Sequence, residues 1–67
     1  MTVWRYDIES KWLDDGNEWE SGYESKEYAE MAMDERITEI IDEIAAKHPE
    51  LSDEEIESFI DGSVREE

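Results

Sequence analysis

Carboxylates are the residues of this chain with the clearest capacity for chemistry. Asp and Glu account for 22 of its 67 residues, against six Lys and Arg, and the formal net charge at pH 7 is −16. Carboxylates in such numbers suit acid–base catalysis, coordination of a hard cation, or attraction of a basic partner. Each purpose requires a different arrangement along the chain.

No spacing typical of an active site or a metal site is found. The carboxylates are too numerous to single out an acid–base pair, and the one histidine, His48, has no recognisable nucleophile or orienting group. The segment Asp14-Asp15-Gly16-Asn17-Glu18 lacks the alternating ligands and the Glu at position 12 of an EF-hand loop, so we interpret it as a turn. We therefore predict a protein that is not an enzyme, with no catalytic residues, no metal site and no cofactor.

The negative charge instead predicts a basic protein as partner. Direct binding of nucleic acid is excluded, because two polyanions repel each other. Carboxylates at i, i+4 on a helix stand about 5 to 6 Å apart, a spacing of the same order as successive phosphates along a strand. An acidic helix face could therefore imitate a nucleic-acid backbone; the alternative is a solvated helix face. The predicted acidic contact residues are Glu20, Glu24, Asp34, Glu35, Glu39, Asp42, Glu43, Glu54 and Glu57.

Length and composition limit the number of domains and the location of the protein. A chain of 67 residues is one domain, 1–67, near the lower limit for an independent hydrophobic core. It has no cysteine, no signal-peptide pattern and no apolar run of the roughly 18 residues that a membrane span needs. We expect a soluble protein of the cytoplasm that does not bind membranes, with only residues 65–67 frayed.

Alternating residues near the N-terminus predict a β-hairpin. Aromatic and β-branched residues recur at every second position over residues 3–13, which is typical of a strand with one buried face. Asp15-Gly16 is a favoured pair for a two-residue type I′ turn, and a second strand follows over about 18–24. This register places Trp12 opposite Trp19.

The same register sorts the hairpin into two faces. Trp4, Trp12 and Trp19 fall on the apolar face and are predicted to be core residues, whereas Glu20 falls on the opposite, polar face. Gly22 marks either a bulge or the end of the second strand. The outer edges of a two-stranded sheet stay open, so we also consider a homodimer through a sheet edge.

Two helices are expected to cover the hairpin. Ser25 is the predicted N-cap of a long helix over about 26–47, which carries an isoleucine stripe at helical spacing and ends at His48-Pro49. Ser52 and Glu55 form a capping box for a short helix over about 53–61, with Gly62 as its C′ glycine. The predicted fold is α+β: a two-stranded antiparallel hairpin packed on a long and a short helix.

Two apolar residues of the long helix fall outside this core. On a helical wheel, Tyr28 and Met31 lie opposite the isoleucine stripe. They form either an exposed apolar contact set within the acidic surface, as in many interfaces, or a first turn that packs against the strands or kinks.

In size, charge and spread of Asp and Glu, the chain resembles small acidic phage-encoded inhibitors that mimic nucleic acid, including anti-CRISPR and anti-restriction proteins. The resemblance covers the whole chain and implies inhibition by occupancy, in which carboxylates take phosphate positions in the basic groove of a host effector. It also implies action in the bacterial cytoplasm. The segment Trp19 to Ala32 is similar to the strand-to-helix joint of small phage inhibitors of host RNA polymerase.

Two other functions are consistent with the composition. The chain could be an acidic adaptor or inhibitor that docks on a host enzyme such as RNA polymerase through Tyr28, Met31 or a sheet edge. It could also be a salt-adapted acidic domain, although its Glu outnumber its Asp and isoleucine dominates its core, contrary to our expectation for such a domain.

Overall fold

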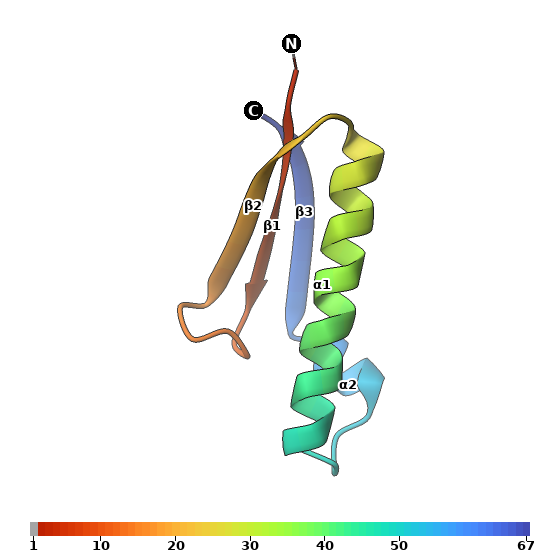
Figure 1. Cartoon of the computed structure of the whole chain (residues 1–67). Coiled ribbons are helices and arrows are strands. Elements are labelled where there is room, and N and C mark those ends of the chain that lie inside the picture. The colour runs from red at the N-terminus through yellow and green to blue at the C-terminus, as the bar shows by residue number, and fades with distance from the viewer. Residues whose placement is uncertain (1) are drawn as a thin grey trace.

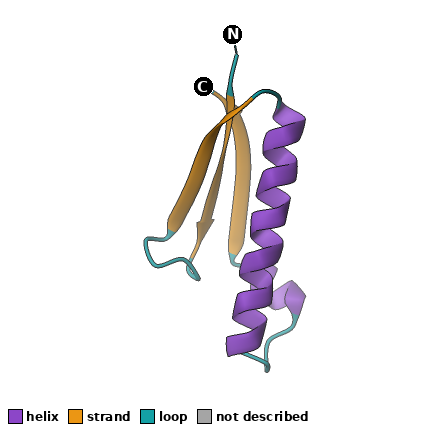
Figure 2. Cartoon of the chain, viewed as in Figure 1, coloured by secondary structure: helices purple, strands orange, loops and turns teal. Residues whose placement is uncertain are grey.

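The chain forms a three-stranded antiparallel sheet with two helices on one of its faces (Figures 1 and 2). This is a computed structural model, and it describes residues 2–67. The strand order is β2-β1-β3, so the N-terminal strand is central. The α+β class is confirmed, with one strand more than predicted. The elements are β1 (Trp4–Ser10), β2 (Asn17–Tyr23), α1 (Lys26–Lys47), α2 (Asp53–Glu57) and β3 (Ile60–Glu66).

The long helix α1 begins and ends where the sequence predicts. Ser25 is its N-cap, and the Ser25 hydroxyl accepts a hydrogen bond from the Tyr28 amide at 3.2 Å. At the other end His48 is the C-cap, and its amide donates to the carbonyl of Ile44 at 2.8 Å. Proline at position 49 disfavours a helical conformation at His48, which explains the stop.

The hairpin register differs from the predicted one. Trp19 lies opposite Asp7 rather than Trp12, because β1 ends at Ser10 and residues 11–16 form a wide loop instead of a two-residue turn. The Ser10 amide closes this loop on the carbonyl of Gly16 at 3.1 Å. Trp12 leaves the strand and donates its indole N–H to the carbonyl of Ile56 at 3.1 Å. This bond to the end of α2 replaces hydrogen bonding that residues 11–16 would otherwise make as part of the strands.

The residue opposite Trp19 is Asp7 rather than Trp12, an odd number of positions away. Because neighbouring residues of a strand point to opposite faces, this shift reverses which β2 side chains face the helices. Trp19 therefore lies on the outer face of the sheet, 54% exposed, and the prediction that it is a core residue is wrong. Glu20 faces α1 instead of the polar side. Gly22, with φ of +92°, forms a bulge that returns Tyr23 to the inner face opposite Trp4.

The second helix is shorter than predicted, and a strand follows it. Ser52 is the N-cap of α2, as predicted, since the Ser52 hydroxyl accepts from the Glu55 amide at 3.2 Å. The Glu55 carboxylate accepts from the Ser52 hydroxyl at 3.3 Å, rather than from the Ser52 amide as in a complete capping box. However, α2 ends at Glu57, and Gly62 lies within β3 opposite Ile8 rather than at a helix C-terminus. The reason is that the free edge of β1 offers a full ladder of hydrogen bonds, which a lone turn of helix does not.

The C-terminal residues expected to fray also belong to this ladder. Arg65 lies opposite Arg5, and Glu66 opposite Trp4. The Glu67 amide donates to the carbonyl of Val3 at 3.0 Å. The two ends of the described chain therefore lie side by side (Figure 1).

The core lies between the inner face of the sheet and the helices. Isoleucines from β1, α1 and α2 form its centre, and Trp12 packs against it while half-buried. Trp4 is also half-buried rather than enclosed. The buried apolar residues are Tyr6, Ile8, Ala29, Ile40, Ile44 and Ile56.

Replacement of Gly62 by a branched residue should destabilise this packing. A Cβ atom at position 62 would lie 2.9 Å from the sulfur of Met33 and 3.2 Å from Cδ1 of Ile37. We expect Gly62→Val to lower the free energy of unfolding by about 1 to 3 kcal/mol, as overpacking does. Urea unfolding measures this change. Ser63→Val, on the opposite face of the same strand, is the matched control, and equal stability of the two variants would contradict the packing assigned to Gly62.

Candidate functional site

Four carboxylates lie on the side of α1 that faces away from the sheet. Asp34, Glu35, Glu39 and Asp42 are all exposed, whereas the isoleucines of the same helix point to the core. We call these four residues the acidic outer face. At 1.5 Å of rise per residue, Glu35 and Asp42 are about 10 Å apart along the axis. Four negative charges thus occupy about two turns of a rigid element.

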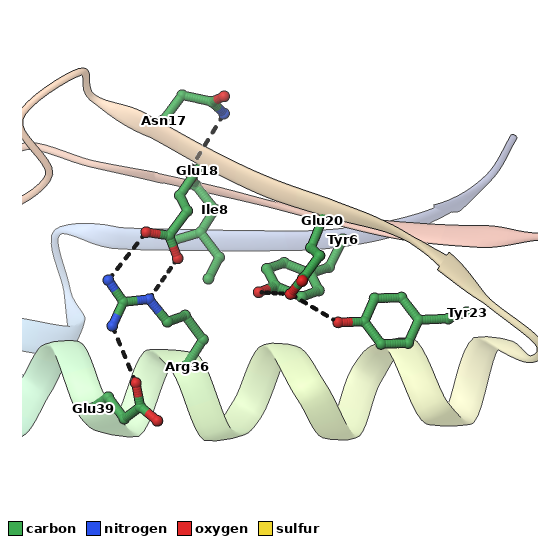
Figure 3. A network of polar contacts seen from close by, with 8 residues as sticks. All are labelled: Tyr6, Ile8, Asn17, Glu18, Glu20, Tyr23, Arg36 and Glu39. Carbon is green, nitrogen blue, oxygen red and sulfur yellow. Dashed lines mark hydrogen bonds and ion pairs between the residues drawn. The ribbon is translucent and has the colours of Figure 1, made fainter.

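The one cation within this stretch of sequence is engaged elsewhere. Arg36 donates from Nη2 to one carboxylate oxygen of Glu18 on β2 at 3.0 Å, and from Nε to the other (Figure 3). Its Nη1 reaches Glu39 at 3.2 Å. Hydrogen bonding to Glu18 raises the pKa of Arg36. Arg36 therefore joins α1 to β2 and neutralises a carboxylate of the sheet, which leaves most of the acidic outer face without a counter-charge.

The sequence did not reveal this bridge because the predicted register put Glu18 on the wrong face of β2. The signal that could have found it is Gly22. A bulge at this glycine allows Tyr23 and Glu20 to share the inner face, and Glu18 lies on the same face two residues before Glu20.

The remaining predicted acidic contacts are dispersed. Glu20 points toward the helix, Glu24 lies between β2 and α1, and Glu43 lines a groove on another side of α1. Glu54 and Glu57 are exposed on α2. The structure therefore brings together the four residues of the acidic outer face and does not add these five to it.

Glu20 forms a structural contact within the sheet, on its inner face. Its Oε2 accepts hydrogen bonds from the hydroxyl groups of Tyr6 at 3.2 Å and Tyr23 at 3.0 Å (Figure 3). Burial, followed by the negative charge of Glu20, raises the pKa of Tyr6 to about 12, and burial together with this hydrogen bond raises the pKa of Tyr23. Both tyrosines thus stay protonated donors at neutral pH.

Tyr28 and Met31 lie at the N-terminal end of the acidic outer face. Their exposed fractions are 57% and 64%, so the alternative in which the first turn packs against the strands does not apply. Met31 also borders a shallow hollow that is lined by Asp34, Glu35, Thr38 and Glu39. An apolar contact surface is therefore continuous with the acidic one.

A groove separates the loop 11–16 from the C-terminal half of α1. Its volume is about 300 Å³, and its apolar lining comes from Trp12, Leu13, Ile40 and Ile44. Asp14, Asp15, Glu18 and Glu43 add carboxylates, while Arg36 and Lys47 supply cations. This groove could not be predicted from the sequence, because the expected two-residue turn would leave no loop to form its wall.

Two further findings concern residues 2–67. No group of three or more His, Cys, Asp or Glu in this part of the chain is arranged to hold a metal ion. None of its helices combines the length and apolar character needed to cross a membrane.

No family model, curated protein or solved structure matches the chain. Its charge, geometry and contacts therefore carry the functional argument.

The Tyr6–Glu20 contact predicts a loss of stability at alkaline pH. The pKa of Tyr6 is about 12 in the folded protein, against about 10 for an unfolded tyrosine. The unfolded chain therefore loses this proton first, and the free energy of unfolding should fall between about pH 10 and pH 12, by at most about 3 kcal/mol. Below pH 10 this contribution is fully present.

Denaturant unfolding at a series of pH values tests this expectation. Tyr6→Phe should flatten the alkaline decline, whereas Tyr28→Phe, which alters an exposed ring, should leave it unchanged. An alkaline decline of the same size in the Tyr6→Phe variant would contradict the role assigned to Tyr6.

Proposed function

We propose that this protein binds and blocks a basic, nucleic-acid-binding effector of a bacterial host, with the acidic outer face of α1 in place of a phosphate backbone. It acts by occupancy, as an anti-CRISPR or related anti-defence inhibitor encoded by a phage would act in the host cytoplasm. The observation that carries this proposal is the row of exposed carboxylates Glu35, Glu39 and Asp42 on a rigid helix. The one neighbouring cation, Arg36, is bound to Glu18 of the sheet and contacts only Glu39 of this row.

Rigidity matters because a nucleic-acid groove presents its Lys and Arg at fixed positions. The helix α1 has 22 residues and packs on the sheet through buried isoleucines, so its carboxylates are held in place before binding. A preorganised set of charges loses less conformational entropy on association than a disordered acidic tail does. The net charge of −16 also accelerates encounter with a basic surface at low ionic strength.

The second candidate function is an acidic adaptor or inhibitor that docks through its apolar residues, for example on RNA polymerase. The exposure of Tyr28 and Met31 favours it, since aromatic and Met side chains are enriched at interface cores. In this case the carboxylates form a charged rim that speeds association, and the affinity comes mainly from the two apolar side chains.

Competition binding tests the first function. A guide-loaded CRISPR nuclease and a restriction enzyme, each with labelled DNA, serve as effectors, and the protein is titrated in at increasing salt. We expect displacement of DNA that weakens as salt rises, because the contacts are ionic. A ternary complex of effector, DNA and protein with both effectors, or no displacement from either, would contradict occupancy of these grooves.

Charge reversal separates the two functions. We expect the triple change Glu35→Lys, Glu39→Lys and Asp42→Lys to weaken binding of a mimic at least about tenfold. The control reverses the same number of exposed charges outside α1, with the changes Asp15→Lys, Glu50→Lys and Glu66→Lys.

The adaptor function is tested by a different variant. Tyr28→Ser with Met31→Ser should abolish binding by an adaptor, measured against bacterial RNA polymerase. If the protein needs molar salt to fold, this would favour a salt-adapted domain.

A further inference from the structure

The face of the sheet opposite the helices is not covered by any element of residues 2–67 (Figures 1 and 2). We call it the open sheet face. The register assigns to it every second residue of each strand, in three rows across the sheet. They are Ser21, Arg5 and Arg65 in the first row, Trp19, Asp7 and Ser63 in the second, and Asn17, Glu9 and Asp61 in the third.

This face differs from the rest of the molecule in charge. The nine residues of these rows include two arginines and three carboxylates, a formal net charge of −1, while the whole chain carries −16. The helices, loops, ends and inner face therefore carry a net charge of −15, and this includes Glu67, whose carboxylate lies 3.9 Å from Arg5 beside the first row. The open sheet face is the side on which another strongly acidic body meets the least repulsion.

An aromatic residue lies in the middle row. Trp19 is 54% exposed although it is one of the largest apolar side chains. Arg5 covers part of it, with Cζ 4.4 Å from the ring centroid. Two hydrogen bonds to Asp7, at 2.7 and 3.1 Å, hold Arg5 in this position, and Arg65 approaches the same carboxylate at 3.7 Å. The Trp19 ring is thus fixed in place with about half of its surface in water.

The charges of the outer rows have opposite signs. The first row carries Arg5 and Arg65, and the third carries Glu9 and Asp61. Arg65 retains 65% exposure of its side chain, and Asp61 is also exposed, so both are free to contact another molecule. A face with one positive end, one negative end and a central aromatic residue is complementary to itself.

We propose that a second copy of this chain packs on the open sheet face, about a two-fold axis that runs across the strands through the row of Trp19. This rotation reverses the strand direction and places the first row of each copy over the third row of the other. Arg65 then faces Asp61 of the second copy, Arg5 faces Glu9, and the two Trp19 rings meet at the axis. The interface is isologous, as in most homodimers.

The charge pattern selects this axis. A two-fold axis parallel to the strands would place like rows over one another, so that arginines face arginines, and like charges in contact are unfavourable. Asp7 does meet its own copy in the proposed arrangement, but each Asp7 is already paired with Arg5 and Arg65. This pairing limits the repulsion at the centre.

The size of the face predicts a weak dimer. Three strands about 4.8 Å apart, each contributing five residues from one outer row to the other at about 3.3 Å per residue, present roughly 15 by 17 Å. This is about 250 Å² per copy and about 500 Å² for the pair, well below the roughly 1,200 Å² at which standard specific interfaces begin, so the dimer is a transient one. Association should therefore depend strongly on the few best contacts, namely Trp19 and the Arg65–Asp61 pairs.

Sedimentation velocity of the full chain over a range of concentrations, in about 0.15 M salt, tests the proposal. We expect a reversible monomer–dimer equilibrium that Arg65→Glu or Asp61→Arg weakens at least about tenfold. The double variant with both changes recreates an opposite pair across the axis and should recover most of the wild-type affinity. Lys26→Glu and Glu27→Lys, on the first turn of α1, are matched charge controls and should have little effect.

Trp19 distinguishes the open face from the sheet edge. Antiparallel pairing of two β3 edges would also bring Asp61 near Arg65 of a second copy, but Trp19 lies two strands away on β2. Trp19→Ser should weaken the face-to-face dimer at least about tenfold. A Trp19→Ser variant that dimerises like wild type would overturn the proposal in favour of the edge, and a monomer at all concentrations would overturn both.

Discussion

A small apolar core must hold a surface of like charges together, and the rest of the structure follows from this constraint. Six apolar residues are buried and others pack against them half-buried, while the chain carries −16. Polar contacts on the inner face of the sheet add to this packing. The Glu18–Arg36 pair joins β2 to α1, and the hydrogen bonds that Tyr6 and Tyr23 donate to Glu20 connect side chains of β1 and β2. Carboxylates that would otherwise add to the repulsion become part of the packing.

The helix α1 could be predicted from the sequence with its bounds, because its signals are local. Ser25 as N-cap, the isoleucine spacing and Pro49 all act within a few residues of where they stand. The N-cap Ser52 of α2 is an equally local signal. The same helical periodicity places the acidic outer face away from the isoleucines, but it left open whether Tyr28 and Met31 are exposed, which the structure shows them to be.

The sheet was predicted less well because its register depends on distant contacts. The bond from Trp12 to Ile56 favours a wide loop over the two-residue turn, and these residues are 44 positions apart. The strand β3 forms because β1 has a free edge with which it can pair. The residues 60–66 alone carry no pattern that predicts this pairing. Trp19 and Glu20 were consequently assigned to the wrong faces, and the Arg36 bridge and the charge rows of the open sheet face were missed.

The central position of β1 also has a kinetic meaning. The hairpin of β1 and β2, and the helix α1, involve residues close in sequence, whereas β1 and β3 are separated by some 50 to 60 residues. Pairings between distant segments have a large loop-closure cost and slow the folding of small domains. Closure of the sheet by β3 is thus the least local event in the assembly of this fold. The bond between Val3 and Glu67, at the neighbouring ends of the described chain, connects the two residues along the β1–β3 pairing that are farthest apart in sequence.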